Sequence, residues 1–280
     1  LHYTLRALGH RLPLRKIFRL VFINLFFSNV TPMATGGGVA QIWYLTRHGV
    51  PVARATAATT IRTVLAVAFI FSLTPVFLLS LEALDGGIWS SGIGTALAVF
   101  VSLYLGFFAV LLFRTRWMIL PLSALVAGLR KAHLINYRRH DRWQFKLRRE
   151  MLRFALCFSE YLRGAPRDVL LSVVFTAVFL LSLFSFPALI LVGLGQGIDY
   201  FETLGLTSMT TFVMYFAPTP GAAGVAEGAL GTLFSGRVPA SSLVLMVLLW
   251  RFLTIHLGML IGVPITLHIL LKGHTNAKRQ

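Results

Sequence analysis

The sequence has few charged residues and a single cysteine. Only 12% of its 280 residues are charged, whereas 56% are hydrophobic. A soluble domain usually has about 25% charged residues, so an ordinary soluble globular protein is excluded. The lone Cys157 excludes an internal disulfide bond and a metal site built from cysteines.

Motifs of catalytic sites are also missing. The sequence contains no Gly-x-Ser-x-Gly motif, no phosphate loop and no His/Glu/Cys cluster with metal-ligand spacing. The glycine run at residues 36–38 follows no predicted strand, so it does not indicate nucleotide binding. These absences favour a transporter over an enzyme, and we expect no catalytic residue, metal ion or cofactor.

Long apolar runs dominate the sequence instead. Several exceed the roughly 18 residues that indicate a membrane-spanning helix, whereas a transmembrane barrel would show short alternating segments. We therefore predict an all-α, polytopic helical membrane protein, with residues 1–280 in a single integral membrane domain. The chain begins at Leu1 and not at methionine, so we expect further residues upstream.

The positive charge is concentrated in three blocks. The formal net charge is +17, and most of the 26 Lys and Arg residues lie in residues 1–19, 114–167 and 272–280. Such blocks are typical of cytoplasmic segments under the positive-inside rule, so they do not indicate a nucleic-acid partner. We expect a multi-pass protein of the plasma (inner) membrane, with segment 114–167 and the C-terminus in the cytoplasm.

The basic and acidic segments predict the path of the chain. Four spans are expected, at residues 55–81, 92–113, 168–193 and 241–271, with an interruption at Pro75 in the first. Acidic residues mark the outside, namely Glu82, Asp85, Asp199 and Glu202. Residues 146–164, within the basic segment, are expected to form an amphipathic surface helix.

Two further apolar regions, residues 20–46 and 203–236, begin and end on the same side of the membrane. Proline and glycine break each region, and arms of about 10–15 residues are too short to cross a core of roughly 30 Å. We predict two re-entrant hairpins, the first entering from the cytoplasm and the second from outside. Their tips are expected at Pro32, Gly37, Gly38, Pro220, Gly221 and Gly224.

The two hairpins resemble each other in sequence. The matching stretches are 31–32 with 219–220, 38–41 with 224–227, 50–51 with 238–239, and Arg62 with Arg251. The sequence thus predicts an inverted repeat, with residues 1–113 as the first half and 168–280 as the second. Inverted repeats with broken helices are typical of secondary transporters, which bind their substrates where the broken helices meet.

Three charged residues, one in the second hairpin and two in the spans that follow the hairpins, are candidates for binding substrate. Glu227 is expected either to cap helix N–H groups or pair with an arginine, or to handle a proton or a cationic headgroup. Gln41 takes the matching place in the first hairpin without the charge. Arg62 and Arg251 are expected either to form an internal ion pair, most simply with Glu227, or to bind a phospholipid phosphate through the guanidinium fork.

Four uncharged candidates complete the predicted site. His256 is expected either to relay protons together with Glu227 or to bond a backbone carbonyl. Asn29 and Thr31 are suited to satisfy backbone groups freed by the break in the first hairpin. With Thr219 at the second break, they are also expected to line the substrate site.

These motifs resemble those of the lysylphosphatidylglycerol synthase transmembrane region, also called the flippase-like domain family. The resemblance is carried by residues 31–50, 218–230 and 249–262. The family pattern Pro-Gly-Gly-x-Gly-x-x-Glu-Gly matches residues 220–228, with Ala222 departing, and family members commonly have a glutamate where Gly38 stands here. The resemblance implies that the protein moves polar or aminoacylated phospholipids across the bacterial plasma membrane. Membrane phospholipids would then be its partners.

Two other functions stay open at this point. The chain would also suit the membrane region of a phosphatidylglycerol lysyltransferase-type system, with a cytosolic lipid-modifying transferase as its partner. It would equally suit a small-solute or ion secondary transporter on a similar inverted scaffold. A second copy of the chain is a further candidate partner.

Overall fold

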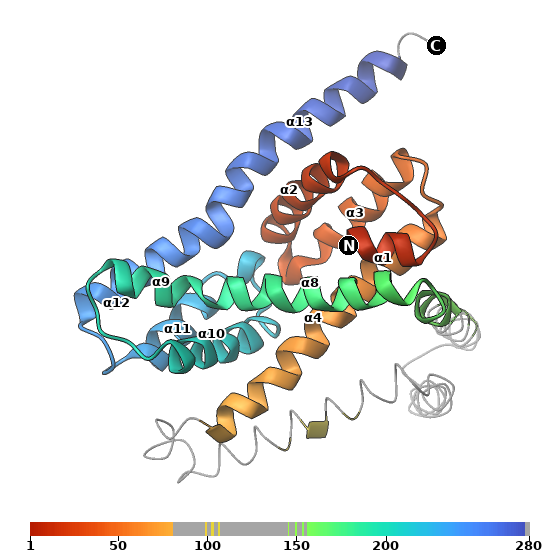
Figure 1. Ribbon diagram of the computed structural model, residues 1–280. Helices are drawn as coiled ribbons and strands as arrows, with labels where there is room; N and C mark the ends of the chain where they lie inside the picture. The colour runs from red at the N-terminus through yellow and green to blue at the C-terminus, as the bar shows by residue number, and fades with distance from the viewer. Residues whose placement is uncertain are drawn as a thin grey trace, which may run out of the picture.

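The computed structural model describes residues 1–80 and 156–277, with isolated helical positions at 99, 102, 103, 106, 145, 149 and 153. This part of the chain consists of helices joined by short turns and contains no strand, which confirms the all-α class (Figure 1). The predicted span 92–113, the predicted loop with Glu82 and Asp85, and most of segment 114–167 lie outside the described residues.

Helices follow one another closely along both described parts. The N-terminal part contains α1 (His2–Ala7), α2 (Leu14–Val30), the 3₁₀ turn η1 (Pro32–Ala34), α3 (Thr35–Arg47) and α4 (Val52–Ser80). Residues 156–162, within the predicted surface helix, are helical. The C-terminal part contains α8 (Pro166–Phe184), α9 (Phe186–Gly193), α10 (Tyr200–Met214), the 3₁₀ turn η3 (Pro220–Ala222), α11 (Val225–Phe234), α12 (Ala240–Arg251), the π-helical turn η4 (Phe252–His256) and α13 (Leu257–Ala277).

Three stretches of described helix are long and apolar enough to cross a membrane: Val52–Phe77, Pro166–Gly193 and Ala240–Ile269. They coincide with three of the four predicted spans. The predicted interruption at Pro75 is wrong, because α4 continues through this residue. Helices in membranes tolerate the loss of the single backbone hydrogen bond that a proline removes. The third stretch is instead interrupted by η4, where the backbone takes π-helical geometry.

The first hairpin consists of α2, η1 and α3, and the second of α10, η3 and α11. Both turn just after a Thr-Pro step into left-handed backbone, which is uncommon outside glycine. The φ angles are 52° and 53° at Met33 and Ala34, and 57° and 54° at Gly221 and Ala222. The two breaks therefore match in conformation as well as in sequence, although their re-entry into a membrane stays a prediction.

Three of the four hairpin arms have the predicted length of about 10–15 residues, since α3, α10 and α11 have 13, 15 and 10 residues. Helix α2 has 17 residues, more than expected, because the basic residues before residue 20 are helical as well. Helix α10 starts at Tyr200 rather than at residue 203, where the Asp199 carboxylate accepts hydrogen bonds from two backbone N–H groups of the first turn.

The bases of the two hairpins lie at opposite ends of α4, which has 29 residues and is about 43 Å long. At the N-terminal end, Arg54 Nη1 lies 3.0 Å from His10 Nε2, shortly before α2 in the chain. Near the C-terminal end, the Phe77 ring contacts Phe201 in the first turn of α10, with 4.9 Å between centroids. Figure 1 shows the two hairpins beside α4, with α2 and α3 towards one end and α10 and α11 towards the other.

Ion pairs tie the helices together at both ends. Residues predicted to be cytoplasmic meet at the end where α4 begins, and residues predicted to be outside meet at the base of the second hairpin. The pairs are Arg6–Asp168 and Arg54–Glu160, each at 3.2 Å, and Arg237–Glu202 at 2.7 Å. The charges are thus sorted along α4 in the order that the predicted path requires.

Close helix contacts join α13 to α2. Gly258 and Gly262 lie on the contact face of α13, and an added Cβ atom at Gly262 would lie 2.5 Å from the Phe22 carbonyl oxygen. Glycines at this spacing allow membrane helices to approach closely. The long C-terminal span therefore packs against the first hairpin after passing the second.

Candidate functional site

The tips of the two hairpins meet and enclose a cavity of about 350 Å³, the tip cavity. Asn29 packs against Gly221, and a Cβ atom added at Gly221 would lie 3.1 Å from Asn29 Oδ1. The lining includes hydroxyl and amide side chains from both halves of the chain: Asn24, Ser28, Asn29, Gln41, Thr59, Thr63, Thr211, Tyr215 and Thr219. It also includes Arg62, Gly38 and Gly221.

Hydrogen bonds from side chains satisfy the broken end of α2. Thr31 Oγ1 donates to the Phe27 carbonyl at 2.7 Å and accepts from the Gly36 N–H at 2.8 Å. Asn29 Nδ2 donates to the Leu25 carbonyl at 2.7 Å. Thr31 thus bonds a backbone N–H group that the break frees at the start of α3, whereas the Leu25 carbonyl that Asn29 contacts lies inside α2. Only Asn29 lines the tip cavity, because the Thr31 side chain turns back onto α2 and α3.

Gln41 joins the two arms of the first hairpin. Its side-chain amide donates to Asn24 Oδ1 of α2, and the residue is only 1% exposed. Its Oε1 atom has no hydrogen-bond partner among the described residues. Asn24 was not among the predicted residues, although a polar side chain inside an apolar run is a signal that could have found it.

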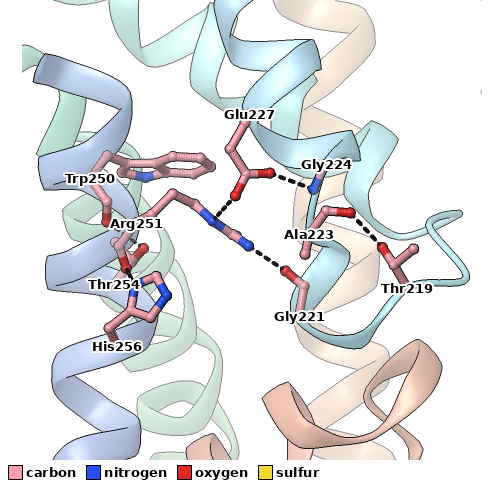
Figure 2. A network of polar contacts seen from close by, with 9 residues as sticks. All are labelled: Thr219, Gly221, Ala223, Gly224, Glu227, Trp250, Arg251, Thr254 and His256. Carbon is pink, nitrogen blue, oxygen red and sulfur yellow. Dashed lines mark hydrogen bonds and ion pairs between the residues drawn. The ribbon is translucent and has the colours of Figure 1, made fainter. Parts of the chain in front are cut away.

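The tip of the second hairpin is held by Glu227 and Arg251 (Figure 2). Glu227 Oε2 accepts from the Gly224 N–H at 2.7 Å, which caps α11. Its Oε1 atom pairs with Arg251 Nε at 2.7 Å, so the predicted ion pair is present and its arginine is Arg251. Arg251 Nη2 also donates to the Gly221 carbonyl at 2.9 Å. The arginine thereby fixes both the cap of α11 and the turn that faces the tip cavity.

Two polar side chains near this pair contact backbone carbonyls. Thr219 Oγ1 donates to the Ala223 carbonyl at 2.9 Å and lines the tip cavity. His256 Nδ1 lies 3.1 Å from the Arg251 carbonyl within the π-helical turn η4. Figure 2 shows His256 one turn along the helix from Trp250 and Arg251. This contact agrees with the alternative in which His256 bonds a backbone carbonyl. Proton relay by His256 stays a prediction.

Arg62 differs from Arg251 in its surroundings. It lines the tip cavity, and its Nε atom is buried without a hydrogen-bond partner. Within the described residues, Arg62 forms no ion pair, whereas Arg251 has both a carboxylate and a carbonyl. Of the two matching arginines, only Arg251 is thus neutralised by a carboxylate among the described residues.

Gln41 and Glu227 align in sequence, but they do not occupy equivalent positions in their helices. Glu227 is the third residue of α11, whereas Gln41 is the seventh residue of α3. The reason is that α3 starts directly after η1, while Ala223 and Gly224 separate η3 from α11. Gln41 consequently lies one turn deeper and bonds across to α2 instead of capping its own helix.

The structure therefore divides the predicted residues into two groups. Those that line the tip cavity are Arg62, Gln41, Asn29, Thr219, Gly38 and Gly221. Those outside its lining are Glu227, Arg251, His256, Thr31, Pro32, Gly37, Pro220 and Gly224. Most members of the second group hold or form the tips. The prediction that Gly37 and Gly38 form the first tip is wrong, because the turn lies at Met33 and Ala34 and both glycines are inside α3. His256 lies in η4 rather than in a tip.

Comparisons with known proteins place the chain in a family. A family model described as the lysylphosphatidylglycerol synthase TM region matches residues 1–262. A UPF0104 membrane protein of Archaeoglobus fulgidus is 26% identical over 258 residues, which cover 91% of this chain and 76% of the relative. No solved structure matched the chain. Since the family model extends over nearly the whole chain, this membrane protein belongs to the lysylphosphatidylglycerol synthase TM region family.

Proposed function

We propose that this protein binds the headgroup of a polar or aminoacylated phospholipid in the tip cavity and moves the lipid across the plasma membrane. The observation that carries the proposal is Arg62, a cation that lines the cavity without an ion-pair partner among the described residues. An unpaired charge inside a membrane protein is costly, and such residues usually mark a substrate path. A lipid phosphate would supply the missing anion through two parallel hydrogen bonds to the guanidinium.

The uncharged lining supports a polar headgroup. Hydroxyl and amide side chains from both hairpins surround the cavity. Such groups can replace the water that a headgroup loses when it leaves the membrane surface, and without that replacement the transfer of polar groups into an apolar interior is expensive. The family description, which names a phospholipid, supports the same class of substrate.

The hairpins also suggest how access would alternate. Their bases lie at opposite ends of α4 and their tips meet beside Arg62. We propose that the end with Arg6 and Arg54 is cytoplasmic, in agreement with the positive-inside rule. A small displacement of either hairpin would then open the tip cavity towards one leaflet, as in transporters with inverted repeats.

Reconstituted vesicles test this proposal. Purified protein in phosphatidylcholine vesicles should increase the rate at which an acyl-labelled phospholipid in the inner leaflet becomes accessible to a membrane-impermeant quencher. The protein-dependent rate is the measured rate minus that of protein-free vesicles. Arg62→Gln should lower this rate at least about tenfold, since it removes a charge-assisted contact. Arg54→Gln, two turns earlier on α4 and paired with Glu160, is the matched control and should keep the rate.

Two results would count against lipid movement. The proposal fails if folded wild-type protein moves no lipid faster than protein-free vesicles do. It also fails if Arg62→Gln and Arg54→Gln have the same effect, because the cavity arginine would then have no special role.

A further inference from the structure

The charge of the tip cavity has one sign. Arg62 is the one charged side chain among the described residues that line the cavity, and these include no carboxylate. Glu227, the carboxylate at the second tip, lies outside the lining, and its two oxygens are engaged by Arg251 and the Gly224 N–H. A headgroup that enters the cavity therefore meets a cation and no free anion.

The start of α3 lies next to the cavity and brings no negative charge to it. Helix α3 begins at Thr35, and the residues just before it, Met33 and Ala34, line the cavity. A helix N-terminus carries partial positive charge from its unpaired N–H groups. The first turn of α3 contains no acidic residue, whereas Glu227 neutralises the first turn of α11. The first hairpin thus lacks a carboxylate beside Arg62 of α4, whereas the second hairpin has Glu227 beside Arg251.

Space for such a carboxylate exists at Gly38. This residue lines the cavity, and a Cβ atom added to it would contact only Thr59 Cγ2, at 3.9 Å. Thr59 lies three residues before Arg62 on α4, and both line the cavity. Position 38 therefore has room for the Cβ atom of a side chain at the edge of the cavity.

We infer that the tip cavity selects phospholipids whose headgroup has a net negative charge, a phosphate diester without an amine. The inference rests on the proposed function and narrows its substrate class. The phosphate would pair with Arg62, and the polar side chains would bond uncharged headgroup atoms. A headgroup with an added ammonium, whether zwitterionic or cationic, would place a second cation in a cavity without a compensating carboxylate, which is unfavourable at this separation.

Transport rates of phospholipids with different headgroups test this selectivity of the tip cavity. Phosphatidylcholine vesicles with the wild-type protein should move acyl-labelled phosphatidylglycerol at least about tenfold faster than labelled phosphatidylethanolamine or lysylphosphatidylglycerol, a ratio that one like-charge contact readily produces. Gly38→Glu should pair with Arg62, slow phosphatidylglycerol by about the same factor and raise the rate of lysylphosphatidylglycerol. Gly38→Gln has the same size without the charge and should keep the wild-type preference.

The possible results separate this inference from the proposed function. Equal rates for the three lipids, or fastest movement of lysylphosphatidylglycerol, would overturn the inference and leave lipid movement standing. The same holds if phosphatidylglycerol is preferred and Gly38→Glu leaves that preference unchanged. No movement of any lipid would overturn the proposed function. A soluble anion would be the substrate if vesicles took up glycerol phosphate while phosphatidylglycerol stayed in place, and both proposals would then fail.

Discussion

Removal of the Glu227 charge should destabilise the second hairpin far more than its partly exposed position suggests. In Glu227→Gln the side chain keeps its length and an oxygen for the Gly224 N–H, so the cap of α11 is largely retained. The ion pair with Arg251 is lost. Arg251 Nη1 has no hydrogen-bond partner among the described residues, so the guanidinium would keep the Gly221 carbonyl and its contact with the Trp250 ring but no anion.

The size of the effect follows from the burial of the two partners. Surface ion pairs contribute about 0–1 kcal/mol, and removal of one partner from a buried pair costs about 3–5 kcal/mol. The Arg251 side chain is 7% exposed and the Glu227 side chain is 37% exposed. We therefore expect an intermediate cost of about 2 kcal/mol, or a Tm lowered by about 4–8 °C at this chain length.

A second ion pair of the same length supplies the control. Glu202 and Arg237 also lie 2.7 Å apart, but their side chains are 28% and 30% exposed, and Arg237 keeps its hydrogen bond to the Leu233 carbonyl. Glu202→Gln should therefore cost less than about 1 kcal/mol. The Tm of both variants is measured by heating the protein in detergent and determining the fraction that stays monodisperse.

Two outcomes would refute this reasoning. Equal Tm shifts for Glu227→Gln and Glu202→Gln would show that burial of the arginine does not set the cost. A double variant of Glu227→Gln with Arg251→Met should lose less stability than the two single variants together, because no unpaired buried cation remains. Additive losses would mean that the two side chains do not act as a pair.

Three further predictions concern packing and reactivity. Gly262→Ala should lower the Tm by several degrees, since its Cβ atom would lie 2.5 Å from the Phe22 carbonyl oxygen, and overpacking costs about 1–3 kcal/mol. Gly231→Ala, inside α11 with open space around its Cβ, should leave the Tm unchanged or raise it slightly. Burial and the nearby Glu160 raise the pKa of the Cys157 thiol, so its alkylation rate should rise with pH later than that of a free cysteine. Glu160→Gln should shift that rate profile to lower pH, and an unchanged profile would exclude the electrostatic contribution.

Apolar length was sufficient to predict the long helices, because hydrocarbon demands about 20 apolar residues whatever the packing. The breaks were predictable from proline combined with glycine, since glycines follow Pro32 and Pro220 within a few residues, whereas none closely follows Pro75, which lies inside α4. The Glu227–Arg251 pair followed from charge, because one carboxylate near two intramembrane arginines favours an ion pair. These parts of the structure depend on composition and short spacing.

Other parts depend on where helices restart, which short motifs do not determine. Gln41 matches Glu227 in sequence, but α3 starts earlier than α11 relative to its break, so the two side chains face different neighbours. For this reason the sequence alone did not distinguish Arg62, without an ion-pair partner among the described residues, from Arg251. The π-helical turn at 252–256 was not expected either, because its residues have no distinctive composition.

The π-helical turn η4 has a geometric consequence for the whole molecule. Arg251, directly before η4, is attached to the second tip, and Gly258 and Gly262, shortly after it, are packed against α2. One residue added to or removed from a helix changes the rotational phase of everything beyond it by about 100°. The geometry of this single turn therefore sets the rotation of one hairpin relative to the other about the axis of the long C-terminal helix. Rewinding it as ordinary α-helix would rotate one hairpin relative to the other and would also move Ile255, which lies in η4 and lines the tip cavity.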